Sequence, residues 1–227
     1  MAAPGASNTV VVVTGGDPVD PTHLRDLPPG ARVVAADSGI DHAHALGLVV
    51  DLAIGDFDSV SAEGLLRAHD DGATMERHPT AKDATDLELA LDAALSFGPS
   101  HIHVLGGHGG RLDHLLANAL LLGSPTYAAA LITAQMGAAR VTIVWERAEL
   151  HGPLGDTVSL LPLHGRATGV RTTGLLYPLV DEDLLPGSSR GISNELVDEH
   201  ARVTVTAGVL AAIQPGRLDP NHQEIPR

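Results

Sequence analysis

The first 60 residues contain three short, mainly apolar runs, and each one ends abruptly in a turn of Gly or Asp residues. The runs are 10–13, 32–36 and 52–54, followed by Gly15-Gly16, Asp37-Ser38-Gly39 and Gly55-Asp56-Phe57-Asp58. Runs of this length, rich in Val and Ala, are typical of strands buried on both faces of a parallel sheet. Such a sheet needs helices to cover it, so this feature favours an α/β fold.

Helical patterns alternate with these runs. Leu87, Ala90, Leu91, Ala94 and Leu95 recur with helical spacing, and Gly98-Pro99 ends the pattern. Thr85 and Glu88 have the spacing of a capping box at the start of this helix. Residues 40–46, 61–69 and a stretch that ends near residue 122 also favour helices, the last one after a predicted strand at 101–105. The alternation predicts a doubly wound, mostly parallel sheet.

The pattern changes after residue 139, where short strands separated by Gly and Pro replace the strand and helix alternation. We expect strands at 141–145, 157–161, 169–176, 202–206 and 209–213. This pattern is typical of a small β-sandwich. The sequence therefore predicts an α/β domain over residues 1–140 and a β-sandwich domain over 141–227, with a polar tail from Pro215. Residues 122–139 form an Ala-rich connection to which the pattern assigns no element.

Composition excludes several classes of function. The chain has 28 acidic and 14 basic residues, a net charge of −14, so nucleic acid is not an expected partner. It has no Cys, which excludes disulfides, Cys-ligated zinc and thiol catalysis. The N-terminal residues lack a basic region, and the apolar run at 10–13 is too short for a signal or a membrane span. We expect a cytoplasmic protein with no membrane partner.

Two carboxylates, Asp56 and Asp58, follow the predicted strand at 52–54 directly. The carboxyl ends of parallel strands are where ligands bind in open α/β sheets. Carboxylates one residue apart can share a hard cation such as Mg²⁺, although an exposed Asx turn explains the same residues. Asp37 follows the neighbouring strand, and by itself we expect it to cap the next helix. Asp83 and Asp86 either face the metal from a helix start or simply stabilise the helix dipole.

A glycine-rich stretch, Gly106-Gly107-His108-Gly109-Gly110, lies between a predicted strand and a predicted helix. Main-chain amides without side chains, together with a helix N-terminus, predict an anion cradle, to which Arg111 adds a cation. The stretch lacks the Gly-x-Gly-x-x-Gly spacing of dinucleotide sites. Lys82 is the only lysine in the chain and follows Ala81, so the chain has no Walker A loop. Lys82 can instead meet a phosphate beside Asp83.

Four motifs in one order resemble the thiamine pyrophosphokinase family. They are Ala36-Asp37-Ser38-Gly39, Ile54-Gly55-Asp56-Phe57-Asp58-Ser59, Lys82-Asp83-x-Thr85-Asp86-x-Glu88 and Gly109-Gly110-Arg111-x-Asp113-His114. The C-terminal half adds Gly174-Leu175-Leu176-Tyr177-Pro178-Leu179 and Ser193-Asn194-Glu195, which are similar to the substrate-side signatures of that family. The resemblance covers residues 10–213.

The resemblance implies an activity and a set of site residues. The family transfers the pyrophosphoryl group of ATP to the hydroxyl of thiamine with Mg²⁺, giving thiamine diphosphate and AMP, and it is homodimeric. Carried over by motif, the catalytic residues are Asp56, Asp58, Asp86 and Arg111, and the metal ligands are Asp56, Asp58, Asp83 and Asp86. The nucleotide-binding residues are Asp37, Lys82, Gly109, Gly110, Arg111 and Asp113, and the thiamine-side residues are Tyr177, Ser193 and Asn194.

Three other functions fit part of the sequence. A related pyrophosphokinase acting on another alcohol, such as a hydroxymethylpterin, would need the same phosphate-binding motifs. A haloacid-dehalogenase-like phosphatase would use Asp56 as a nucleophile, and this leaves the 109–114 motif unexplained. A binding module that has lost catalysis would bind the ligand and form no AMP.

Overall fold

A computed structural model describes residues 8–216 of the chain, and these residues form two compact units. The first unit ends at Gly137 and the second begins at Ala138. Most of the expected polar tail, 217–227, lies outside the described residues. In the described part of the chain, no helix is long and apolar enough to cross a membrane.

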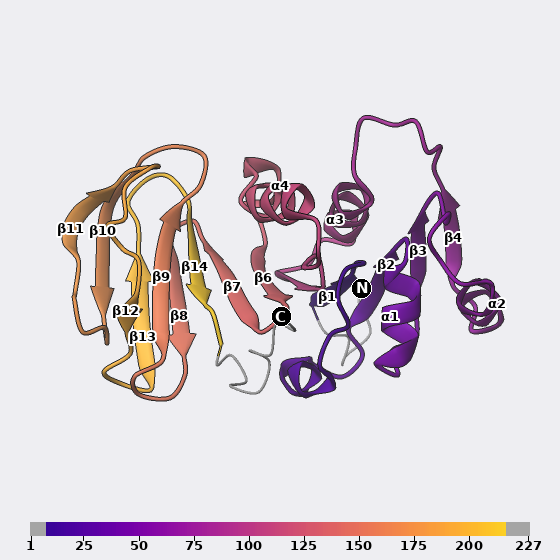
Figure 1. The fold of residues 1–227 in the computed structure, drawn as a ribbon, viewed down its shortest axis with the longest axis horizontal. Helices are drawn as coiled ribbons and strands as arrows, with labels where there is room; N and C mark the ends of the chain where they lie inside the picture. The colour runs from indigo at the N-terminus through magenta and orange to yellow at the C-terminus, as the bar shows by residue number, and fades with distance from the viewer. Residues whose placement is uncertain (1–7, 217–227) are drawn as a thin grey trace, which may run out of the picture. The chain divides into compact units, whose positions relative to one another are not determined.

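The first unit is built on a parallel sheet with the strand order β6-β5-β1-β2-β3-β4 (Figure 1). The strands are β1 (Thr9–Val13), β2 (Arg32–Ala36), β3 (Leu52–Gly55), β4 (Thr74–Arg77), β5 (His101–Leu105) and β6 (Leu131–Met136). The chain runs from β1 through β2 and β3 to β4 on one side, and then returns to add β5 and β6 on the other. The strand order therefore reverses between β1 and β5, which is where open α/β sheets bind ligands.

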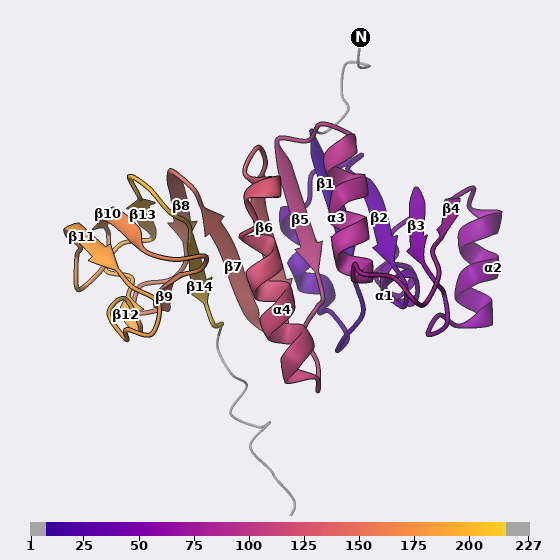
Figure 2. The ribbon, with the colours of Figure 1, turned by 90° about the horizontal axis from the view of Figure 1, so that it is seen from above.

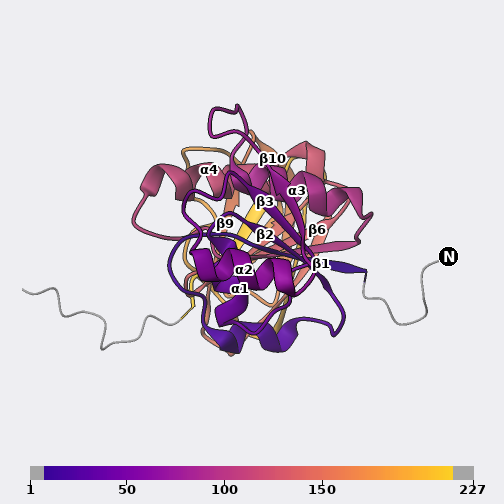
Figure 3. The ribbon, with the colours of Figure 1, turned by 90° about the vertical axis from the view of Figure 1, so that its right-hand side faces the viewer.

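Helices cover both faces of this sheet, as expected for a doubly wound fold. They are α1 (Gly39–Ala45), α2 (Ala62–Asp70), α3 (Asp86–Ser96) and α4 (Leu112–Leu122), with short 3-10 helices η1 (Pro21–Asp26) and η2 (Pro125–Tyr127). The side view shows α3 and α4 on one face and α1 and α2 on the other (Figure 3). Seen from above, α3 and α4 lie over the central strands (Figure 2).

The core of the first unit forms because its strands bury almost every side chain. Val12, Val13 and Val34 in β1 and β2 have no exposed surface, which is the burial expected for apolar runs without polar alternation. Helix α3 buries Leu87, Ala90, Leu91 and Ala94 against the sheet, so its predicted apolar stripe is confirmed.

The second unit is a β-sandwich of antiparallel strands, as predicted. One sheet has the order β11-β10-β13-β8, and β7, β14, β9 and β12 pair in the other layer. The bounds are β7 (Ala139–Val144), β8 (Arg147–His151), β9 (Thr157–Pro162), β10 (Ala167–Thr173), β11 (Val180–Leu184), β12 (Asn194–Glu195), β13 (His200–Thr204) and β14 (Leu210–Gln214). Leu150, Leu160, Leu184 and Leu210 are fully or almost fully buried in a single core cluster of this unit.

Several elements differ from the sequence prediction. Strand β6 occupies the Ala-rich connection to which no element was assigned, and β4, β8, β11 and β12 were not predicted. The strand expected at 169–176 ends at Thr173, because Gly174 has φ 76° and a β-carbon at this position would clash with the His200 carbonyl. A residue with a side chain would clash there, so the chain turns at this glycine.

Candidate functional site

A cavity of about 470 Å³ opens at the carboxyl ends of the strands in the first unit. Its walls come from the turns that follow β1, β2, β3 and β5, from the loop before α3, and from α4. The lining residues include Thr14, Gly15, Gly16, Asp37, Ser38, Asp56, Ser59, Thr80, Lys82, Thr85, Asp86, Gly107, His108, Gly109, Gly110, Arg111, His114 and Asn118. The cavity thus lies across the point where the strand order reverses, as the fold predicts.

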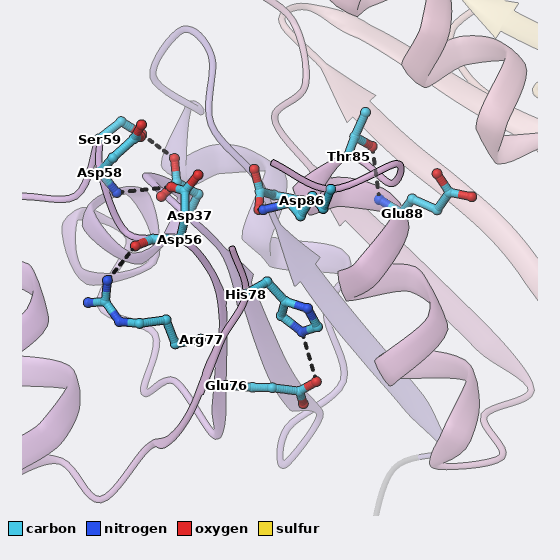
Figure 4. Close-up of polar contacts among 11 residues, drawn as sticks. Asp37, Asp56, Asp58, Ser59, Glu76, Arg77, His78, Thr85, Asp86 and Glu88 are labelled. Carbon is cyan, nitrogen blue, oxygen red and sulfur yellow. Dashed lines mark hydrogen bonds and ion pairs between the residues drawn. The ribbon is translucent and has the colours of Figure 1, made fainter. Parts of the chain in front are cut away.

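Three carboxylates, Asp37, Asp56 and Asp58, form an acidic group at one end of this region (Figure 4). Each offers an oxygen atom, and these atoms all lie within 4.8 Å of one another. Asp56 Oδ1 accepts a hydrogen bond of 3.1 Å from the Asp58 main-chain N–H. Asp37 Oδ2 accepts one from the Ser59 hydroxyl. The sequence prediction that Asp56 and Asp58 lie together is confirmed, and the structure adds Asp37 to them.

The backbone at Phe57 explains why Asp56 and Asp58 face outward together. Phe57 has φ 63°, in the left-handed region that a bulky residue rarely adopts, and its side chain is buried in the core. Arg77 supports this turn, because its Nη1 atom donates a 2.8 Å hydrogen bond to the Asp56 carbonyl. The Arg77 guanidinium also lies 5.1 Å from the centre of the Phe57 ring. Arg77 therefore contacts both the main chain and the aromatic ring of this turn.

Electrostatics distinguishes the three carboxylates. The hydrogen bond from the Asp58 main chain lowers the pKa of Asp56 below its ordinary value. The charge of Asp56 is the main cause that raises the pKa of Asp58, and Asp37 and Asp86 add to it. Asp37 Oδ1 is buried and has no hydrogen-bond partner among the described residues. An unpartnered buried oxygen beside two repelling carboxylates fits a hard divalent cation such as Mg²⁺, which takes oxygen ligands.

The expectation that Asp37 caps the next helix is wrong. Helix α1 begins at Gly39 with Ser38 in the N-cap position, and no side chain makes a cap hydrogen bond there. Asp37 itself has φ 47°, and one of its oxygens binds Ser59. Two residues later the chain requires a glycine, because a β-carbon at Gly39 would clash with the main chain of Val13 and Thr14. This close contact of α1 with β1 places Asp37 at the cavity.

Asp86 lies beside the acidic group, at the start of α3 (Figure 4). Its Oδ1 atom accepts a 2.7 Å hydrogen bond from Lys82 Nζ, which gives this lysine a carboxylate partner. Thr85 is the N-cap of α3 and accepts a hydrogen bond of 3.2 Å from the Glu88 N–H, as the capping pattern predicts. Asp83 is exposed in the preceding loop and is not among the residues that line the cavity.

The glycine loops after β1 and β5 form the other end of the cavity. The Gly107 N–H donates to the Gly15 carbonyl at 2.8 Å, and the Asp17 N–H donates to the His108 carbonyl at 2.6 Å. Gly16 has φ 123°, and a β-carbon there would clash with the His108 carbonyl. The two loops therefore pack together through their main chains, and the 108–110 segment that follows lines the cavity.

Arg111 lines the cavity and forms a two-point ion pair with Asp113. Its Nη2 atom lies 2.5 Å from Asp113 Oδ2, and its Nε atom lies 3.2 Å from Oδ1. This pairing lowers the pKa of Asp113 to about 2. Asp113 is not among the residues that line the cavity, whereas its partner Arg111 is.

The predicted residues of the second unit form a small site of their own. Asn194 is buried, and its Nδ2 atom donates a 2.7 Å hydrogen bond to the Tyr177 carbonyl while its Oδ1 atom accepts one of 3.0 Å from the Tyr177 N–H. Tyr177 is 60% exposed, and with Asn194 it lines a pocket of about 380 Å³ that includes Ser188 and Arg190. Ser193 is not among the residues lining that pocket, and its N–H donates to Ser159 Oγ at 3.1 Å.

Comparisons with known proteins agree over most of the chain. Residues 30–133 match the model of the thiamin pyrophosphokinase catalytic domain, and residues 141–210 match that of the thiamin pyrophosphokinase vitamin B1 binding domain. The chain belongs to the thiamin pyrophosphokinase family. The thiamine pyrophosphokinase of Bacillus subtilis is 29% identical over 183 residues, which cover 80% of this chain and 86% of that protein.

Solved structures of the family have the same fold. The crystal structure of the thiamine pyrophosphokinase from Bacillus subtilis has a TM-score of 0.81 at 27% identity, covering 92% of this chain and 100% of that one. The structure from Geobacillus thermodenitrificans has a TM-score of 0.77 at 28% identity, covering 93% and 98%.

The two family models fall on different sites of this chain. The catalytic-domain model spans the acidic group, Lys82 and the 107–111 loop, whereas the vitamin B1 binding model spans Tyr177, Ser193 and Asn194. Sequence reasoning missed Ser59, Thr80, His108 and Asn118 among the cavity residues. His108 had a signal, because it is the one residue with a side chain inside the run 106–110.

Proposed function

We propose that the chain transfers the pyrophosphoryl group of ATP to the hydroxyl of thiamine in the presence of Mg²⁺, giving thiamine diphosphate and AMP. The observation that carries the proposal is that the acidic group and the glycine cradle lie at one set of strand ends, with Asp37, Asp56 and the cradle lining a single cavity. Such a cavity offers both a cation site and amides for phosphates, which is what pyrophosphoryl transfer needs. The family membership supports the choice of thiamine.

The metal ligands proposed here are Asp37, Asp56 and Asp58. They differ from the set inferred by motif, because the oxygen atoms of Asp37, Asp56 and Asp58 lie within 4.8 Å of one another, whereas Asp83 is not part of this group and Asp86 pairs with Lys82. When bound, Mg²⁺ would neutralise charge on the phosphate oxygens and help to orient them. Asp86 remains beside the acidic group, where it can align the substrate through Lys82.

The chain's own groups would position ATP for an in-line displacement. The amides of 108–110 and the Arg111 guanidinium would hold phosphate oxygens, and Lys82 would reach them from the other wall. In the reaction, the hydroxyl oxygen of thiamine forms a bond to the β-phosphorus, and the bond from that phosphorus to the bridging oxygen of AMP breaks. Arg111 and Lys82 would stabilise the charge that develops on the leaving oxygen, while the hydroxyl proton passes to solvent.

The pocket of the second unit is the proposed contribution to thiamine binding. Tyr177 presents an exposed ring that can stack on an aromatic ligand. Asn194 holds the Tyr177 main chain through two hydrogen bonds, so its contribution is to fix that ring in place. Ser193 belongs to the same stretch and stays a predicted contact.

The proposal includes a homodimer. On α4, Leu112, Leu116 and Leu120 are spaced by four residues, and they are 66%, 56% and 49% exposed. Residues with this spacing share one helix face, and three exposed leucines on one face are typical of a surface that packs on a partner. Arg111 and Asn118, at the start and in the body of the same helix, line the cavity. A second copy of the chain packed against α4 would therefore stabilise the helix that forms part of the cavity wall.

The test is to incubate the purified chain with ATP, Mg²⁺ and thiamine and to follow nucleotides and thiamine diphosphate by chromatography. The expected result is equal amounts of AMP and thiamine diphosphate. AMP that forms only with a hydroxymethylpterin would keep the reaction and replace the acceptor. Inorganic phosphate without AMP would favour the phosphatase function, and ligand binding without AMP would favour a binding module.

A further inference from the structure

His108 lies where three loops of the first unit meet. It belongs to the loop after β5, and its Nδ1 atom lies 3.2 Å from Asp17 Oδ2, in the loop after β1. Its ring also packs against Gly137, in the turn after β6, where a β-carbon would lie 3.1 Å from Nδ1. The His108 carbonyl accepts the 2.6 Å hydrogen bond from the Asp17 N–H. The main chains of His108 and Asp17 are thus joined by a hydrogen bond, and their side chains lie within ion-pair distance.

Asp17 places a negative charge beside the anion cradle. A β-carbon built on Gly109 would lie 3.5 Å from the Asp17 N atom and 3.6 Å from its Oδ1 atom. The carboxylate is therefore next to a glycine whose amide is offered to a phosphate. A chain with a net charge of −14 has little excess positive charge to offset it.

The lysine and the arginine that line the cavity are already paired. Lys82 Nζ lies 2.7 Å from Asp86, and Arg111 lies 2.5 Å from Asp113. In the described residues, the group that faces the Asp17 carboxylate within ion-pair distance is the His108 ring. His108 Nδ1 has no hydrogen-bond partner in the described residues, so its effect on the carboxylate 3.2 Å away is electrostatic: the ring edge screens the Asp17 charge from the cradle.

We propose that His108 is a positioning residue for the polyphosphate: it screens Asp17 and holds its carboxylate in place beside Gly109. The inference rests on the proposed function and adds a residue to its phosphate site. Loss of His108 leaves the Asp17 charge uncompensated next to the cradle. It therefore weakens ATP binding, whereas the acidic group and the transfer step are unchanged.

The experiment compares four proteins: the unaltered chain, His108→Gln, Asp17→Asn and the double variant. Binding of ATP with Mg²⁺ is measured by calorimetry without thiamine, and KM and kcat are measured with thiamine. His108→Gln is expected to weaken ATP binding and raise KM about two- to fivefold, the scale of an exposed ion pair, with kcat unchanged. Asp17→Asn is expected to bind ATP at least as tightly as the unaltered chain.

The double variant decides between screening and direct contact. If His108 acts through Asp17, Asp17→Asn restores ATP binding to the His108→Gln protein. A double variant as weak as His108→Gln would mean that the ring contacts phosphate itself, and the proposal would be overturned. Unchanged binding in His108→Gln would overturn it too, as would a loss confined to kcat.

A histidine and aspartate pair on helix α2, which contributes no residue to the cavity, serves as the control. His69 and Asp70 on α2 are exposed, with Nδ1 and Oδ1 3.6 Å apart. His69→Gln and Asp70→Asn are expected to leave ATP binding unchanged, and equal losses there would overturn the proposal. Failure of the proposed function is a separate result, because the unaltered chain would then form no AMP.

Discussion

At the residue scale, the turn at Phe57 determines the geometry of the acidic group. A left-handed backbone at a bulky residue costs roughly 1–3 kcal/mol. Burial of the Phe57 ring and the contacts of Arg77 offset this cost. The result is that Asp56 and Asp58, on either side of a buried residue, both present oxygens to Asp37. Because the three carboxylates repel one another, a bound cation would stabilise this arrangement.

Asp58→Asn tests this preference through stability as well as activity. Because the folded chain raises the pKa of Asp58, its ionised form destabilises the fold. This destabilisation is absent below the ordinary pKa of 3.8 and grows as pH rises through the raised pKa. At pH 7 without metal, the variant is expected to melt above the unaltered chain, as measured by calorimetry.

The same variant is expected to lose the response to Mg²⁺. AMP formation should fall by more than about 100-fold, because charge neutralisation worth several kcal/mol is removed. The rise in melting temperature on adding Mg²⁺ should also shrink. Asp83→Asn is the comparison, since Asp83 does not belong to the acidic group of Asp37, Asp56 and Asp58. If Asp83→Asn loses as much AMP formation as Asp58→Asn, Asp83 is a metal ligand after all.

Residue-level prediction succeeded where a motif ends a strand and failed where the backbone is unusual. Asp56 and Asp58 were predicted because an apolar strand ends immediately before them. The role of Asp37 as a helix cap was wrong, because its left-handed φ of 47° leaves no trace in the sequence. Asp17 had no signal either, since it contacts His108 only after two distant loops have packed together.

At the element scale, α3 connects stability to the site. Its N-cap, Thr85, and its first residue, Asp86, both line the cavity, and its apolar face packs on the sheet. A loosened helix start would therefore move Asp86 and its partner Lys82.

Thr85→Ala is expected to lower the free energy of unfolding by about 1 kcal/mol, because the Glu88 N–H loses its partner. Far-UV circular dichroism is a suitable probe, since the helices in the described residues all lie in the first unit. Fluorescence of Trp145, the only Trp of the chain, follows the second unit and should change less. Thr85→Ser keeps a hydroxyl and should retain most of the stability. If it unfolds as easily as Thr85→Ala, the cap is not the cause.

Elements were predictable from the sequence when their periodicity was strong. Helix α3 has an apolar stripe, a capping pair and a Gly-Pro stop, and all three signals agree. Strand β4 was missed because its residues, Thr74–Arg77, are mostly exposed and polar at the sheet edge. Strand β6 was missed because its burial comes from neighbouring elements, while its sequence, LITAQM, contains two polar residues.

At the scale of the whole molecule, the exposed face of α4 predicts a dimer. Light scattering after size-exclusion chromatography is expected to give twice the chain mass of 23.4 kDa. Leu116→Gln combined with Leu112→Gln should shift the mass towards one chain, because the apolar surface for the partner is removed. Leu66→Gln is the control, since Leu66 on α2 is equally exposed. A dimer that survives the double variant would place the interface elsewhere.

The cavity of the first unit is lined by residues between Thr14 and Asn118, and the Tyr177 pocket by residues from the second unit. Under the proposed function, selection for nucleotide chemistry and selection for the acceptor act on separate stretches of the chain. Mutations after Gly137 can therefore alter acceptor preference while the phosphate-handling residues stay as they are. Relatives of this chain that transfer the group to other alcohols are therefore expected to differ from it most in the second unit.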